Sequence, residues 1–119
     1  MSQIKRYSEI RFKVGLDENN YPVDIKWSAS DTEDQQLRDC KCIMLSMWDT
    51  LQKQTMRIDL WTNQLSTDEM HAHYFQSLLS MTEAYVRATG NPMVMEEMKN
   101  FVNTLARKTA DWEDGQNLP

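Results

Sequence analysis

The sequence predicts an α+β domain in which a four-stranded antiparallel sheet, made of two hairpins, is followed by two helices packed on one face. Apolar side chains alternate with polar ones in four short segments before residue 62, the period of half-buried strands. From residue 66 onward they recur every third or fourth position, as in helices. Because the strands precede the helices, an antiparallel sheet is favoured. We expect one domain over residues 1–119.

The first predicted hairpin begins with a strand at residues 9–16, followed by a polar turn of four residues. Alternation resumes from Tyr21 to Trp27. The register that such a turn imposes puts the apolar side chains of both strands on one face and sets Lys13 across from Asp24. The expected apolar pairs are Leu16 with Tyr21, Val14 with Val23, Phe12 with Ile25, and Ile10 with Trp27.

The second predicted hairpin follows residues 28–40, a polar and acidic segment that we interpret as a flexible, exposed connection. Its strands are residues 42–48 and 55–61, joined by a loop at residues 50–53. The expected apolar pairs are Met47 with Met56, Leu45 with Ile58, and Ile43 with Leu60.

The other face of this second hairpin is too apolar for a surface that only water contacts, so we expect another subunit or protein to cover part of it. It would carry Cys42, Met44, Ser46, Trp48, Thr55, Arg57, Asp59 and Trp61. Arg57 and Asp59 suggest either acid–base chemistry or an ion pair between sheets or between subunits. The ion pair is favoured because no histidine or nucleophile accompanies them.

Two helices are predicted after the strands. Ser66 and Glu69 form a capping box, which indicates a helix over residues 66–89 that ends at a glycine. An Asn-Pro pair then starts a second helix over residues 92–109. The acidic tail at residues 111–119 is expected to be frayed.

Charge and composition exclude several classes of protein. Thirteen basic and eighteen acidic residues give a net charge of −5, which disfavours nucleic-acid partners and anionic membranes. No segment has the roughly 20 apolar residues of a membrane span, and the N-terminus has no apolar signal region. Two cysteines cannot form a disulfide framework, and reduced thiols suit the cytoplasm. We expect a cytoplasmic protein without nucleic-acid binding or membrane insertion.

No catalytic or metal-binding motif stands out. The residues able to ligate a metal are Cys40, Cys42, His71 and His73. The Cys-x-Cys spacing is shorter than in common zinc sites, and His71 and His73 point about 200° apart around a helix. Nucleophile-elbow and phosphate-loop patterns are absent. We therefore expect no enzyme activity, no metal and no cofactor.

Methionine is unusually frequent, with nine residues in the chain. Three of them, Met70, Met81 and Met98, occupy helix stripes and are expected in the core. Met93 and Met95 are the ones expected to be exposed, where flexible side chains could adapt to apolar partners.

Several runs of sequence together resemble one family. They are residues 43–49 (IMLSMWD), 57–62 (RIDLWT), 68–70 (DEM) and 87–90 (RATG), with Ser8-Glu9-Ile10, residues 16–19, Pro22 and Trp27 nearer the N-terminus. These runs resemble the gliding motility-associated GldC family of Bacteroidetes over nearly the whole chain. The resemblance implies an accessory role in gliding and carries no catalytic residues.

The order of elements is also similar to that of SecB-type export chaperones, which are oligomers that hold unfolded clients in apolar grooves. The leading hypothesis is a non-enzymatic SecB-like homo-oligomer, a dimer or tetramer, that binds a protein partner or unfolded client. A specific adaptor without chaperone activity is the alternative, and a small ligand-binding domain or enzyme is the third. The expected partner or oligomer interface comprises Met44, Trp48, Arg57, Asp59, Trp61, Met93 and Met95.

Overall fold

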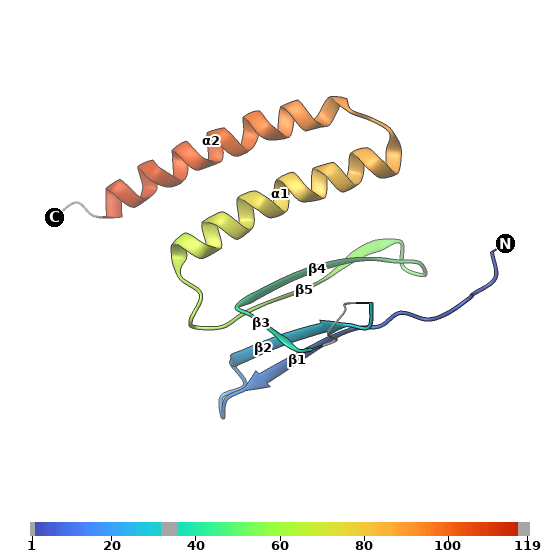
Figure 1. The fold of residues 1–119 in the computed structure, drawn as a ribbon. Helices are drawn as coiled ribbons and strands as arrows, with labels where there is room; N and C mark the ends of the chain where they lie inside the picture. Colours follow the sequence, from blue (N-terminus) through green and yellow to red (C-terminus); the bar gives the residue numbers. More distant parts are fainter. Residues whose placement is uncertain (1, 32–35, 117–119) are drawn as a thin grey trace. The chain divides into compact units, whose positions relative to one another are not determined.

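The computed structural model describes residues 2–31 and 36–116. In these ranges the chain forms five antiparallel strands and then two helices, which confirms the α+β class (Figure 1). It divides into two compact units, a strand unit that ends at Ser66 and a helical unit that begins at Thr67. None of the described helices combines the length and the apolar character that crossing a membrane requires.

The first sheet has the order β1-β2-β3, with β1 at Ile10–Leu16, β2 at Pro22–Ala29 and β3 at Arg38–Cys40. The predicted register of β1 and β2 is wrong by two residues, because Phe12 lies opposite Trp27 and Lys13 lies opposite Lys26. A shift of two keeps every side chain on its face, so the alternation itself holds.

The register differs because the turn between β1 and β2 closes around one side chain. Asp17 Oδ1 accepts hydrogen bonds from the backbone N–H groups of Asn19 and Tyr21, at 2.9 and 3.0 Å. Asn20 adopts a positive φ of 66°, and an irregularity between Gly15 and Leu16 displaces the remaining pairs. The expected four-residue turn was inferred from a run of polar residues, and such a turn does not predict this displacement.

Strand β3 lies inside the segment that was predicted to be a connection, and the same segment contains the end of β2. Residues 32–35 of that segment lie outside the described residues. Cys40 pairs with Ile25, and the guanidinium of Arg38 lies 5.8 Å from the ring centre of Trp27. Lys26 forms ion pairs with Asp24 on its own strand, at 3.4 Å, and with a β3 carboxylate, Asp39, at 2.5 Å.

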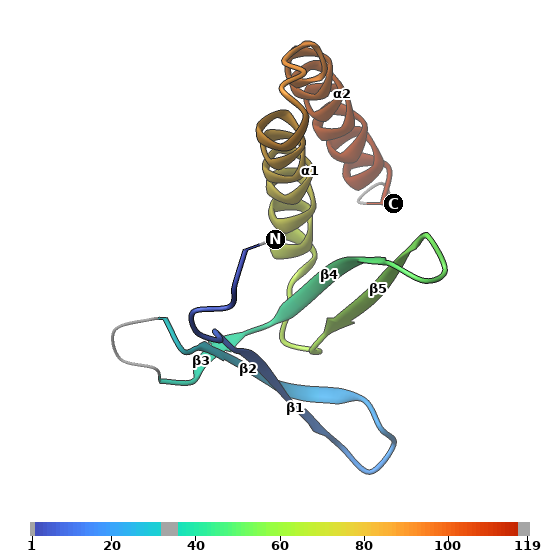
Figure 2. The ribbon, with the colours of Figure 1, turned by 90° about the vertical axis from the view of Figure 1, so that its right-hand side faces the viewer.

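The second sheet contains only β4, Cys42–Asp49, and β5, Gln54–Trp61. Its predicted register is confirmed at every pair from Cys42 opposite Trp61 to Asp49 opposite Gln54. The prediction of a single four-stranded sheet is wrong. The chain bends at Lys41, between β3 and β4, so that β4 leaves the first sheet, as Figure 2 shows.

The helical unit consists of α1, Thr67–Thr89, and α2, Met93–Gln116, which run antiparallel (Figures 1 and 2). Ser66 precedes α1 as predicted, and Gly90, at φ 76°, ends it. Asn91 Oδ1 accepts a hydrogen bond from the backbone N–H of Met93, which caps α2. The expectation of a frayed tail at residues 111–119 is wrong for residues 111–116, because α2 continues through Gln116. Residues 117–119 lie outside the described residues.

Few apolar side chains are fully buried within either unit. Ile25 and Ile43 are buried in the strand unit and Val102 in the helical unit. Many large apolar side chains on both units retain at least 40% of their exposed area. Where such side chains form a contiguous patch, the patch is a candidate site for contact with another protein.

Candidate functional site

The candidate site is one face of the second hairpin, here called the hairpin face. Its cross-strand pairs are Cys42 with Trp61, Met44 with Asp59, Ser46 with Arg57, and Trp48 with Thr55. Side chains two residues apart on a strand point to the same side, so the confirmed register brings all eight together. The composition expected for this face is therefore confirmed.

A paired charge lies at the centre of the hairpin face. Arg57 donates two hydrogen bonds to Asp59, from Nε to Oδ2 at 3.1 Å and from Nη2 to Oδ1 at 2.8 Å. Its remaining Nη1 donates to the hydroxyl of Ser46 on β4. This fork geometry fixes the guanidinium and links the two strands.

The ion pair shifts the protonation equilibria of both its members. The hydrogen bonds from Arg57 lower the pKa of Asp59, and the same contact raises the pKa of Arg57. Asp59 is therefore held as a carboxylate, which makes it a poor general acid near neutral pH. Burial, followed by the charge of Asp59, raises the pKa of the neighbouring Cys42 thiol, so Cys42 is a weak nucleophile there.

Two exposed tryptophans flank this charged pair along the hairpin face. Trp48 is 67% exposed near the loop, and Trp61 is 54% exposed at the end of β5. Met44 lies half-buried between them. Tryptophan and arginine are the residues most enriched among those that dominate the energy of protein interfaces.

The strands of this hairpin also have unpaired outer edges. Within residues 2–31 and 36–116, β4 pairs only with β5, and β5 only with β4. A strand edge offers a row of backbone donors and acceptors to an incoming chain. An isolated two-stranded sheet is of marginal stability, so a further strand would stabilise it.

The two methionines predicted to join this interface lie on α2, in the helical unit. Met93 is 80% exposed, as expected, at the first residue of the helix. Met95 is half-buried, contrary to the prediction, because it lies seven residues before the buried Val102 and thus on the same side of the helix. Met81, predicted to be in the core, is instead 56% exposed.

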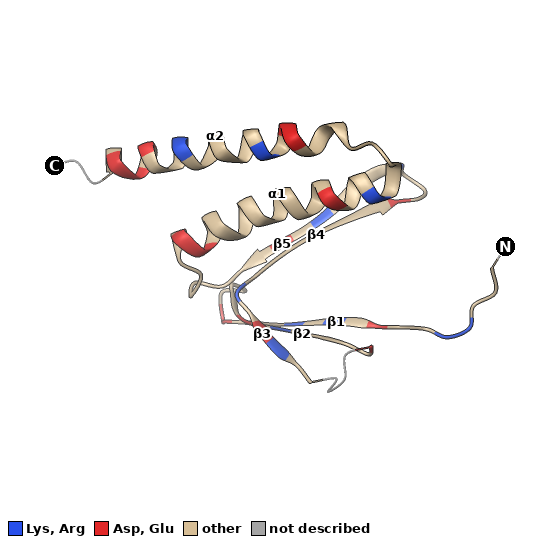
Figure 3. Cartoon of the chain, turned by 45° about the horizontal axis from the view of Figure 1, so that its top comes forward, with Lys and Arg blue, Asp and Glu red and all other residues tan. Residues whose placement is uncertain are grey.

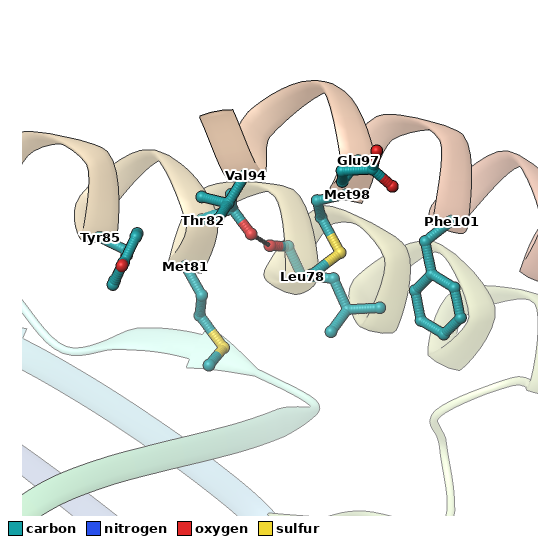
Figure 4. A pocket seen from close by; sticks show the side chains of 8 residues that line it. All are labelled: Leu78, Met81, Thr82, Tyr85, Val94, Glu97, Met98 and Phe101. Carbon is teal, nitrogen blue, oxygen red and sulfur yellow. Dashed lines mark hydrogen bonds between the residues drawn. The ribbon is translucent and has the colours of Figure 1, made fainter. Parts of the chain in front are cut away.

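A second surface was not anticipated as a site. An apolar groove of about 570 Å³ runs between α1 and α2 and is here called the helix groove (Figure 4). It is lined by Leu78, Met81, Thr82, Tyr85, Val94, Glu97, Met98 and Phe101. The apolar stripes that form it are visible in the sequence, but there they indicate a core.

One cluster has the donor atoms of a metal site. Single ligand atoms of Asp68, His71 and Glu113 lie within 4.8 Å of one another. His71 Nε2 lies 2.8 Å from Glu113 Oε1, and the ring of His71 stacks beside Phe75 and meets the edge of Trp112. The prediction considered only cysteines and histidines as ligands, so it included His71 but neither Asp68 nor Glu113. The cluster supplies nitrogen and oxygen donors, and it also forms a plain contact between the helices.

Comparison with known proteins identifies the family. Residues 22–111 match the model of the gliding motility-associated protein GldC-like family. The chain belongs to the GldC-like family. No curated protein and no solved structure matches it. The matched range of this GldC-like chain includes β2 through most of α2, and therefore contains both the hairpin face and the helix groove.

Proposed function

We propose that this gliding motility-associated protein is a non-enzymatic cytoplasmic accessory that binds other proteins through the hairpin face. The observation that supports this most is the exposure of Trp48 and Trp61 on either side of the Arg57–Asp59 ion pair. The proposal includes assembly as a homo-oligomer, a dimer or tetramer, and SecB-like capture of unfolded clients.

The chemistry of the hairpin face suits an extended polypeptide. A segment in strand conformation would pair its backbone with an unpaired edge of β4 or β5, which provides affinity without requiring a particular sequence. Apolar side chains of that segment would cover Trp48 and Trp61 and remove their area from water. The Arg57 guanidinium, already fixed by Asp59, loses little freedom on binding.

The direct test measures suppression of aggregation. Reduced, unfolded lysozyme is diluted into buffer with and without the protein, and light scattering is followed over time. We expect the natural chain to suppress scattering and the double variant Trp48→Ala/Trp61→Ala to lose most of that effect. Leu51→Ala is the matched control, because Leu51 is 92% exposed in the loop of the same hairpin but belongs to neither strand.

The outcomes separate a chaperone from an adaptor. Suppression that survives the double variant would overturn the assignment to the hairpin face. If the natural chain does not suppress aggregation, yet the double variant abolishes gliding of a strain that carries it as its only copy, the protein is a specific adaptor. If both scattering and gliding are unaffected by the double variant, the hairpin face has no part in the function.

A further inference from the structure

The helical unit has an apolar surface that continues beyond the helix groove. Tyr74, Leu78, Met81 and Tyr85 on α1 follow helical spacings of three and four, and Val94, Met98, Phe101, Leu105 and Trp112 do so on α2. We call these nine residues the helix stripe. Thr82 on α1 and Val102 on α2 each follow a stripe residue by one position, about 100° around the helix, and are buried.

The exposed area of the helix stripe is near what a stable dimer requires. Its five largest exposed side chains, Tyr74, Met81, Tyr85, Phe101 and Trp112, are each between 45% and 56% exposed. Since a large side chain buries about 150–250 Å², these five present on the order of 500 Å². The half-buried members add to this, so one copy approaches the ~800 Å² per partner of a standard interface.

Two charges of opposite sign border the helix stripe. Glu97 lines the helix groove, and Lys108 lies eleven residues later, slightly more than three full turns, and so on the same side of α2. In the described part of the chain, neither forms an ion pair with another residue. Figure 3 shows basic positions in the middle of α2 and acidic positions toward both of its ends.

We propose that the helix stripe is the contact between two copies of this chain, with their α2 helices antiparallel across a two-fold axis. A two-fold axis between residues 102 and 103 sets Glu97 of each copy level with Lys108 of the other and brings Phe101 close to the axis. The apolar stripes then cover each other, and both border charges gain a partner. This inference rests on the oligomer within the proposed function but not on client binding.

The first test introduces a charge into the stripe and measures mass by sedimentation equilibrium over a range of concentrations. We expect the natural chain to be dimeric, or tetrameric through a second contact, and Phe101→Glu to lose the stripe contact. Trp61→Glu, on the hairpin face, is the matched control and should keep the stripe dimer. Dissociation by Trp61→Glu and not by Phe101→Glu would overturn the inference while leaving the proposed client binding open to its own test.

A charge exchange tests the antiparallel arrangement without risk to the fold, since both border residues are exposed. Glu97→Lys and Lys108→Glu each replace two attractions per dimer by two repulsions, which should raise the dimer dissociation constant about tenfold. The double variant Glu97→Lys/Lys108→Glu should restore the natural value. Mixing the two single variants should give a heterodimer that is tighter than either homodimer.

Two results would overturn the antiparallel arrangement. A natural chain that is monomeric at every concentration would exclude the dimer, and additive effects in the double variant would exclude the pairing of Glu97 with Lys108. High salt should reduce the difference between the single variants and the natural chain, because the charges are exposed.

Discussion

His71 on α1 and Glu113 on α2 lie 2.8 Å apart, which joins the beginning of the first helix to the end of the second. Their side chains are only 26% and 38% exposed, and Trp112 meets the edge of the imidazole ring. This contact gives a physical reason for the continuation of α2 through residues that the sequence alone suggested were frayed.

Removing this contact should loosen the end of α2. We expect His71→Ala to increase the hydrogen-exchange rate of backbone amides at residues 111–116 and to lower the free energy of unfolding by about 0.5–1 kcal/mol. Gln76→Ala, at an exposed position of α1, is the control and should leave those amides protected. Equal exchange in both variants would show that the contact does not hold the helix end.

The ion pair between Arg57 and Asp59 predicts that the stability of the folded state falls at low pH. The pKa of Asp59 is lowered below its ordinary 3.8, so the carboxylate stabilises the folded state above that value and loses its effect as the pH falls through the lowered pKa. We expect Asp59→Asn to be less stable than the natural chain at pH 6, and we expect this difference to shrink as the pH falls below 3.8, measured by urea unfolding. A stability difference that stays constant as the pH falls from 6 to 2 would contradict this cause.

At high pH, the stability of the folded state should fall as the pH rises, because Lys26 loses its charge. The hydrogen bonds that Lys26 donates to Asp39 and then to Asp24 raise its pKa above 10.5. Its contribution to stability is therefore complete below pH 10.5 and is lost as the pH rises through the raised value. We expect the stability difference between the natural chain and Asp39→Asn to shrink above pH 10.5 in the same unfolding assay. Asp17→Asn changes the turn between β1 and β2 instead, and its effect should not follow that pH range.

The end of α1 predicts a contrast between two glycines. Gly90 has a φ of 76°, where a side chain is strained, so Gly90→Ala should cost about 1 kcal/mol of unfolding free energy. Gly115 lies within α2, and a Cβ there meets no atom within 4 Å, so Gly115→Ala should be neutral or slightly stabilising. Thermal unfolding of both variants measures this contrast. A similar change in the unfolding temperature of the two variants would refute it.

The two cysteines should react slowly in the folded protein. Burial is the main cause that raises the pKa of Cys40 and Cys42 above 9.0, so few thiolates form near pH 8. Labelling with iodoacetamide at pH 8 should be slower than for glutathione and should accelerate when urea unfolds the chain. The variants Cys40→Ser and Cys42→Ser show which labelling rate belongs to which thiol. Labelling as fast as that of glutathione would contradict the raised pKa values.

The sequence predicted the second hairpin correctly because a loop of four residues and an unbroken alternation determine one register. The predicted register of the first hairpin was wrong because hydrogen bonds to a single side chain, Asp17, reorganise the turn. The split into two sheets was not predictable from alternation, since a bend at Lys41 leaves the pattern on either side intact. Strand β3 was missed because three residues are too few to show a period.

The candidate site was partly predictable for similar reasons. Trp48, Arg57, Asp59 and Trp61 followed from strand period alone, since residues two apart share a face. The helix groove was missed because an apolar helix face has the same sequence pattern whether it packs in the core of its own chain or against another chain. Glu113 was missed because long-range contacts with His71, and not local propensity, extend α2.

The single residue between β3 and β4 limits how the length of this chain can change. One residue inserted beside Lys41 would move Cys42 and every later side chain of β4 to the opposite side of the strand, unless the whole hairpin rotated with it. The loop at residues 50–53 carries no such constraint, because its side chains are exposed and its ends already meet at Asp49 and Gln54. A reporter peptide or affinity tag is therefore best inserted into that loop, away from the joint between the two sheets.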